Sequence, residues 1–204
     1  MKTLFTILMV TSFALATQWN SLGSDSPTPY NKEIISSADN ETVIRFSLEG
    51  YSLSPLQTPI GDAYKVGTLL GASLLESGAP DLQKLTVSLK IPNDKHMTAR
   101  VESSEYIELQ NVNIAPSKGN LSRLVNPDDI EYVWGDVYST DEFYPGKLTD
   151  LNTPYILRDF RGQAANVYPF QYNPITETLR IYTEIIISVF ADGPGQVNIL
   201  GDET

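Results

Sequence analysis

The sequence predicts an all-β protein, an antiparallel two-sheet sandwich that is jelly-roll-like and follows a signal peptide. Two observations predict this class. Apolar and polar residues alternate with a period of two along several segments, and Pro, Gly and Asn signals separate these segments. Many short strands joined by turns are typical of sandwiches and jelly rolls. The chain has 204 residues and 41% hydrophobic content, which is enough for one domain with a core.

Residues 1–16 are predicted to be a signal peptide. Lys2 supplies a positive start, an apolar run covers residues 4–15, and small residues fit a cleavage site after Ala16. A transmembrane anchor is the alternative, but the run is shorter than the roughly 20 residues that span a bilayer. We therefore expect an exported protein, secreted or periplasmic. Because the sequence contains no cysteine, packing alone has to stabilise it.

The rest of the chain divides into three parts. Residues 17–41 are rich in Ser, Asn and Pro and lack periodicity, which predicts an extended or loosely attached lead-in. Residues 42–192 carry the alternating pattern and are expected to form the β-sandwich domain. Residues 193–204 are expected to be a tail.

Alternation locates the strands of the predicted domain. In TVIRFSL, residues 42–48, Ile44, Phe46 and Leu48 share the inward face, and KLTVSLKI, residues 84–91, shows the same pattern. In the segment 105–116 the phase changes, which predicts a bulge near Gln110 or Asn111. The other expected strands are residues 131–137, 155–160, 163–172 and 178–190, and a short helix is expected within residues 67–75.

One turn and one aromatic group stand out near the final strand. Asn173 and Pro174 are expected to start the turn into that strand, because Pro cannot donate to a ladder and Asn suits turn geometry. Tyr168, Phe170 and Tyr172 are expected on one face of the strand before it. Such a group favours packing, with a carbohydrate-binding platform as the alternative.

Composition and motifs exclude most catalytic chemistry. The net charge of -11 gives no footprint for nucleic acid or anionic membrane, and it favours solubility or, as the alternative, a basic partner. Without cysteine there is no thiol nucleophile, and the single His96 has no G-x-S-x-G elbow and no second histidine to form a metal site. Acidic pairs at residues 128–129 and 141–142 lack calcium-loop spacing, although weak calcium binding and a glycosidase carboxylate pair stay open. We expect no catalytic residue, no metal site and no cofactor.

A continuous set of motifs identifies a family resemblance. The stretches NVNIAPSKGNLSR, YVWGDVYSTDEFYPGKL and PYILRDFRGQAANVYPFQYNPITETLRIYTEIIISV are similar to the N-terminal propeptide of the gingipain family of secreted, caspase-like cysteine peptidases. The similarity runs from about Ile107 to Val189 and more loosely back to the first strands. The resemblance implies a β-rich domain that binds the peptidase domain of its own precursor, helps it fold and keeps it latent. It also implies that the catalytic Cys belongs to a peptidase domain that would follow, so this chain itself is not expected to be an enzyme.

A second function from a different class stays open. A free-standing secreted β-sandwich that binds glycans or cell surfaces would share the same composition and strand pattern. The expected partner in the first case is the cognate gingipain-type peptidase domain, with Arg or Lys specificity, and no nucleic acid or membrane.

The resemblance directs attention to basic residues, since such a peptidase recognises one cation in a deep pocket. The loop DEFYPGKLTD has Lys147 as its only cation, which is expected at the tip of a Pro-Gly turn with Phe143 and Tyr144 as anchors. The polar loop SKGNLSRLVNPDD is expected to be a processing site, with cleavage after Arg123 and secondarily after Lys118. An ordinary surface loop is the alternative in both cases.

Three further charged residues are assigned structural roles. Arg158 beside Asp159 is expected inside a strand as an ion-pair or hydrogen-bonding residue. Arg161 next to Gly162 is expected to fix the strand turn.

Overall fold

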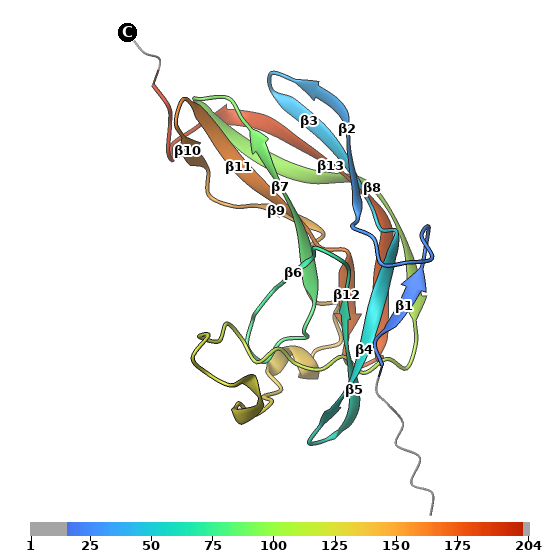
Figure 1. The fold of residues 1–204 in the computed structure, drawn as a ribbon. Helices are drawn as coiled ribbons and strands as arrows, with labels where there is room; N and C mark the ends of the chain where they lie inside the picture. The colour runs from blue at the N-terminus through green and yellow to red at the C-terminus, as the bar shows by residue number, and fades with distance from the viewer. Residues whose placement is uncertain (1–15, 202–204) are drawn as a thin grey trace, which may run out of the picture.

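The computed structural model describes residues 16–201, so the predicted signal peptide up to residue 15 lies outside the described residues. Within this range strands and two short 3₁₀ helices alternate with loops (Figure 1). The strands are β1 Gln18–Ser21, β2 Asn31–Ala38, β3 Glu41–Ser47, β4 Gly50–Thr58, β5 Gly61–Gly67, β6 Ala72–Ser73, β7 Gln83–Lys90, β8 Lys95–Leu109, β9 Thr149–Leu151, β10 Tyr155–Leu157, β11 Phe160–Val167, β12 Phe170–Asn173 and β13 Thr178–Pro194. The 3₁₀ helices are η1 Pro127–Asp129 and η2 Asp136–Ser139.

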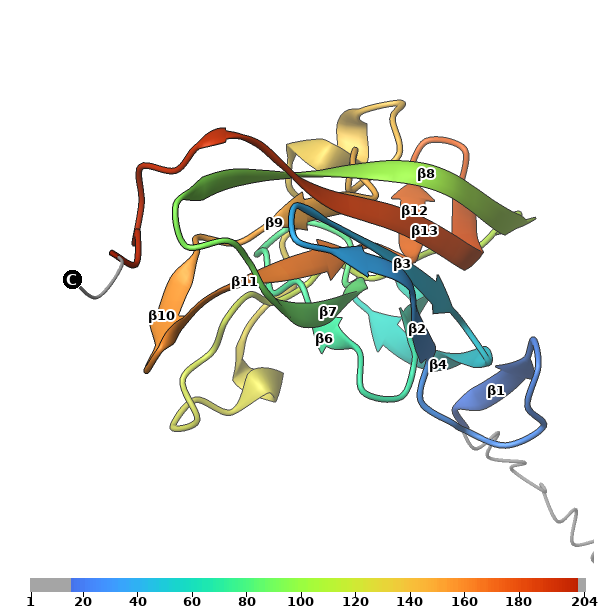
Figure 2. The ribbon, with the colours of Figure 1, turned by 90° about the horizontal axis from the view of Figure 1, so that it is seen from above.

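Three sheets make up the fold. One five-stranded sheet has the order β12-β13-β3-β2 with β8 also paired to β13, and the other has the order β10-β11-β7-β6 with β9 paired to β11. These two sheets form two layers (Figure 2). A smaller sheet has the order β1-β4-β5. Every ladder between these strands is antiparallel, so the predicted all-β antiparallel class is confirmed, with the small third sheet as an addition.

Alternating apolar residues build the core between the layers. On β3, Ile44 and Phe46 are buried as expected, and on β13 the inward residues include Ile185 and Ile187. The sequence alternation therefore identifies which face each of these strands buries, because side chains point to opposite faces at successive positions. The core also takes in Leu85 from β7.

The lead-in is more integrated than expected. β1 pairs with β4 and β2 pairs with β3, so residues 18–38 contribute strands to two sheets. The sequence does not predict these strands, because both lie at sheet edges, where few side chains are buried and the alternation of apolar and polar residues is weak.

Four expected elements differ in the structure. The expected helix within residues 67–75 is wrong, since that segment holds turns and the two-residue strand β6. Residues 131–137 form no strand, because residues 131–135 are irregular and residues 136–137 begin η2. No bulge occurs near Gln110, because β8 ends at Leu109 and Asn111 takes a left-handed conformation with φ 58. The expected strand 163–172 is divided into β11 and β12 by Tyr168 and Pro169.

Candidate functional site

A loop between β8 and β9 is closed at its neck by Gly78. The Gly78 amide donates to the Ser117 carbonyl at 3.0 Å, and the Gly135 amide donates to the Gly78 carbonyl at 2.9 Å. Gly78 has φ 81, and a Cβ on it would lie 3.2 Å from the Gly135 nitrogen, so this close approach requires glycine. We call residues 118–134 the Arg123 loop. The residues that flank its two ends, Ser117 and Gly135, are both hydrogen-bonded to Gly78.

Arg123 and Leu124 occupy the exposed turn of this loop. The Val125 amide donates to the Ser122 carbonyl at 3.0 Å, which closes the turn around the two residues. Leu124 is 96% exposed and Arg123 is also exposed. Among the described residues no ion pair involves Arg123. The loop thus presents one uncompensated guanidinium to solvent.

Lys118, the second candidate for cleavage, is engaged inside the same loop. Its ammonium donates to the Pro127 carbonyl at 2.8 Å and lies 4.3 Å from the centre of the Tyr132 ring. Lys118 is also only half-exposed. The two basic residues of the loop therefore differ in their contacts. The Lys118 ammonium binds a carbonyl and a ring of the same loop. The Arg123 guanidinium makes no ion pair with any described residue.

The second candidate loop, Phe143 to Lys147, is anchored on β12. Tyr144 exchanges two backbone hydrogen bonds with Tyr172, at 2.9 and 2.8 Å, and the Gln171 amide donates to the Pro145 carbonyl at 2.6 Å. The Tyr144–Pro145 peptide is cis. The Phe143 ring stacks against the Arg180 guanidinium, whose carbon lies 3.7 Å from the ring centre. Phe143 and Tyr144, expected to face a partner, are thus largely occupied within the domain.

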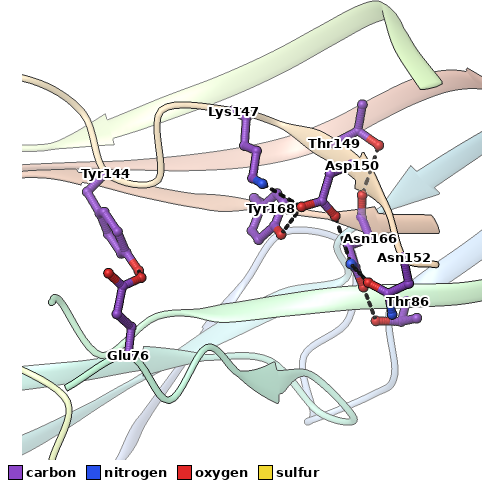
Figure 3. Close-up of polar contacts among 9 residues, drawn as sticks. All are labelled: Glu76, Thr86, Tyr144, Lys147, Thr149, Asp150, Asn152, Asn166 and Tyr168. Carbon is purple, nitrogen blue, oxygen red and sulfur yellow. Dashed lines mark hydrogen bonds and ion pairs between the residues drawn. The ribbon is translucent and has the colours of Figure 1, made fainter. Parts of the chain in front are cut away.

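Lys147 does not project freely from that loop. Its ammonium lies 2.5 Å from a carboxylate oxygen of Asp150, which also accepts the Tyr168 hydroxyl at 2.9 Å (Figure 3). The Asn166 amide donates to the other oxygen of Asp150 at 2.7 Å. Burial raises the pKa of Asp150, but hydrogen bonds from Lys147, Asn166 and Tyr168 together with the Lys147 charge outweigh burial and leave the pKa below its ordinary value.

One connection supports both loops. The Tyr144 hydroxyl donates to Glu76 at 2.7 Å (Figure 3), and Gly78, two residues further on, closes the Arg123 loop. Burial, the hydrogen bond to Glu76 and the charge of Glu76 raise the pKa of Tyr144 well above its ordinary value, so the phenol stays a donor. The sequence near Glu76 and Gly78 does not predict either contact. The local signal was a lone glycine in a turn, which does not reveal what it contacts.

The two arginines of the motif LRDFRGQ lie in different environments. The expectation that Arg158 lies inside a strand is wrong, because Arg158 and Asp159 form the exposed two-residue turn between β10 and β11, where Arg158 has φ 52. Arg161 is 1% exposed, and its guanidinium donates to backbone carbonyls of Pro92, Lys95, Val197 and Asn198. It therefore joins the β7–β8 connection to the C-terminal segment rather than fixing the hairpin turn.

The turn into β13 begins at Asn173 and Pro174. The Asn173 side-chain oxygen accepts the amides of Ile175 and Thr176 at 3.0 and 3.2 Å, which is an Asx-type turn. The Asn173 amide donates to Asp141 at 2.9 Å. This buried side chain ties the turn to the segment that precedes Phe143.

The aromatic group offers no sugar platform. Tyr168, Phe170 and Tyr172 are 6%, 0% and 1% exposed and pack in the interior, so the alternative based on them is wrong. His96 is exposed and its ring nitrogen contacts Asp192 at 2.5 Å. Within residues 16–201 no group of three or more His, Cys, Asp and Glu is placed to hold a metal ion. No helix in that range is both long and apolar enough to cross a membrane.

Comparisons with known proteins point to one family. Gingipain R2 of Porphyromonas gingivalis is 42% identical over 156 residues, which cover 76% of this chain and 21% of the relative. Gingipain R1 of the same organism is 42% identical over 165 residues, which cover 81% of this chain and 17% of the relative. The chain thus spans about a fifth of the length of these curated relatives.

Two solved structures share the fold. A complex of Porphyromonas gingivalis RgpB pro- and mature domains matches with a TM-score of 0.79 and 41% identity, over 82% of this chain and 89% of that chain. A structure concerned with the zymogenic latency of gingipain K from the same organism matches with a TM-score of 0.71 and 20% identity, over 87% of this chain and 100% of that chain, a likeness of fold alone. The family model of Propeptide_C25 matches residues 26–199, and the chain therefore belongs to the Propeptide_C25 family.

Proposed function

We propose that this chain is a propeptide that binds a gingipain-type cysteine peptidase of Arg or Lys specificity, keeps it latent and helps it fold. Membership of the Propeptide_C25 family and the match to a complex of pro- and mature domains support this role. The chain has no cysteine, so the thiol nucleophile belongs to a separate domain. Export through residues 1–16, with a mature start at Thr17, is part of the same proposal.

The observation that carries the proposal is the Arg123 loop. A peptidase pocket for a basic side chain needs a cation that can leave its own domain at little cost. Arg123 meets this condition, since it is exposed, unpaired among the described residues and held in a loop closed at its neck. Lys147 first has to break its contact with Asp150. The geometry therefore favours Arg123 over Lys147 as the inhibitory contact.

The same residue then serves as inhibitory contact and processing site. A peptidase that holds Arg123 in its pocket also has the Arg123–Leu124 bond near its nucleophile. Slow cleavage of that bond would release the peptidase from inhibition. One residue would then carry both the inhibitory contact and the processing site, which the sequence predicts on two separate loops. Lys118 becomes a poor second site because its ammonium is bound to Pro127.

Inhibition constants of single variants test the assignment. Residues 17–204 made alone should inhibit a gingipain-type peptidase, and Arg123→Ala should raise the inhibition constant about 30-fold, since losing a central charged anchor costs about 2 kcal/mol. Lys147→Ala should change it less than about threefold. Arg158→Ala, an exposed arginine in a different turn, is the matched control. A large loss for Lys147→Ala alone would assign the contact to Lys147, and absence of inhibition by the wild type would overturn the proposal.

Processing and folding assistance need their own measurements. N-terminal sequencing of the activated material should show a new start at Leu124, and an intact loop in fully active enzyme would contradict the cleavage proposal.

The folding role predicts that the peptidase domain refolds from denaturant with higher yield when residues 17–204 are present. Equal yields with and without them would remove the folding role and leave latency standing.

A further inference from the structure

We infer that Lys118 is a positioning residue that holds the Arg123 loop in the folded shape in which Arg123 can bind a peptidase pocket without rapid cleavage. This inference rests on the proposed function for its biological meaning. Its structural part concerns only how the loop is held. The positioning role of Lys118 and the proposed function can therefore fail separately.

Lys118 spans the outer part of the loop. Its ammonium lies 2.8 Å from the Pro127 carbonyl, nine residues further along the chain, and Arg123 lies between the two. The same ammonium faces the Tyr132 ring at 4.3 Å. One side chain thus joins the entering segment of the loop to two points on its return path.

Both ends of this contact are held in place. On the entering side, buried Ser117 accepts the Gly119 amide on its hydroxyl at 3.1 Å. On the return side, the Asn126 side chain caps η1 by accepting the Asp128 amide at 3.2 Å. The Tyr132 ring packs against the Trp134 ring, with 6.2 Å between the ring centres. Lys118 therefore connects two ordered supports rather than two freely moving segments.

The segment between these supports has little else to hold it. Within the described part of the chain, the hydrogen bonds of residues 120–125 are those of Val125 and Leu124 to Ser122, all inside the segment. Leu124 is 96% exposed and adds no packing, whereas Leu121 is half-buried. Among the described residues of the loop, the Lys118 ammonium makes the one direct hydrogen bond that spans residues 120–125.

Closure matters because peptidases cleave extended chain. A loop that has to open before cleavage is cut at a rate set by the population of its open form. A charged hydrogen bond and a cation–π contact each favour the closed form. Losing both should raise the open population about tenfold.

Limited proteolysis of the isolated domain tests the structural part. Residues 17–204 are treated with a low concentration of trypsin, and the fragment that starts at Leu124 is quantified by mass spectrometry. Lys118→Ala should yield this fragment about ten times faster than the wild type. Lys118→Arg, which keeps the charge and a donor, should stay within about threefold of the wild type. Lys90→Ala, at an exposed lysine on β7, is the matched control and should leave the rate unchanged.

Two results of this assay would overturn the inference. One is equal cutting of Lys118→Ala and wild type, and the other is equal acceleration by Lys118→Ala and Lys118→Arg. The urea midpoint of Lys118→Ala should match that of the wild type, and a lowered midpoint with uniform cutting at many sites would show global destabilisation instead and would also overturn it.

A second assay with a gingipain-type peptidase separates the inference from the proposed function. The initial inhibition constant of Lys118→Ala should lie within about threefold of the wild-type value. Its inhibition should then be lost about ten times faster than that of the wild type, as the Arg123–Leu124 bond is cut. If the wild-type domain does not inhibit, the proposed function fails while the trypsin result still decides the role of Lys118. If inhibition by Lys118→Ala lasts as long as that by the wild type, the positioning role is overturned.

Discussion

At the scale of single residues, Arg161 shows how a buried charge can be satisfied without a carboxylate. Its guanidinium makes four hydrogen bonds to backbone carbonyls at 2.6 to 2.9 Å, from Pro92, Lys95, Val197 and Asn198. Carbonyl oxygens carry partial negative charge, so several of them together offset the cost of removing the cation from water. Arg161 thereby fastens the C-terminal segment to the end of the sheet.

Replacing Arg161 should therefore cost stability. We expect Arg161→Met to lower the free energy of unfolding by about 3 kcal/mol, because it strands buried carbonyls that had charged donors. Urea denaturation followed by circular dichroism measures this loss. Arg158→Ala, in the exposed turn three residues earlier, should stay within about 0.5 kcal/mol of the wild type. Similar losses for the two variants would contradict the assignment of Arg161.

Asp150 gives a pH-dependent prediction. Its folded pKa lies below its ordinary value, so the carboxylate contributes stability above about pH 4, and this contribution is lost as pH falls through the lowered pKa. Asp150→Asn should thus be less stable than the wild type at pH 7, and the difference should shrink at pH 3. Urea midpoints at both pH values measure it, with Asp159→Asn in the exposed turn as control. A difference that does not depend on pH would show that packing, rather than ionisation, explains the effect.

At the scale of elements, the connection between β6 and β7 organises the site. Glu76 binds Tyr144, and Gly78 receives and donates the hydrogen bonds that close the Arg123 loop. The connection has no regular structure, and its position comes from the strands on either side. A short irregular segment thus contacts both candidate loops.

Gly78 should not tolerate a side chain. We expect Gly78→Ala to speed hydrogen exchange of the Gly135 amide at least tenfold, because φ 81 is strained for alanine and the added Cβ would meet the Gly135 backbone at 3.2 to 3.3 Å. Gly61→Ala is the matched control, since Gly61 also has positive φ, 133, but nothing lies within 4 Å of its Cβ position. If both variants speed exchange at Gly135 equally, the contact at the neck is not what closes the loop.

At the scale of the whole molecule, three sheets share one core. Tyr51 and Val66 from the small sheet belong to the same buried cluster as Leu85, Val167 and Ile187 from the two larger sheets. Since the sheets bury apolar surface against one another, none should unfold alone.

We therefore expect one cooperative unfolding transition. Trp19 of β1 covers Gly50 in the small sheet, so its fluorescence in a Trp134→Phe variant reports on that sheet. Its urea midpoint should coincide with the midpoint from far-UV circular dichroism to within about 0.2 M. An earlier change in Trp19 fluorescence would show that the small sheet is a separate unit.

The sequence by itself determined the all-β class, the inward residues of strands such as β3, the turn at Asn173 and the family resemblance. These follow from local rules, because alternation fixes which face is buried and Asn-Pro chemistry fixes a turn. The same rules failed at the edge strands β1 and β2, where no side chain is fully buried and no alternation results. They also placed Arg158 in a strand, since nothing local distinguishes a tight two-residue turn from a continuous strand.

Only the tertiary structure decided which basic side chain of the candidate loops is left without a partner inside the described part of the domain. The sequence shows Lys118, Arg123 and Lys147 as three basic residues in polar loops, and local rules rank them by their neighbours alone. The structure pairs Lys147 with Asp150 and Lys118 with Pro127 and Tyr132, and leaves Arg123 in an exposed turn. The physical reason is that a charged side chain interacts with the carboxylates, carbonyls and rings that the fold places within a few ångströms of it. The Ser117–Gly78–Gly135 contacts that shape the Arg123 loop join residues far apart in sequence.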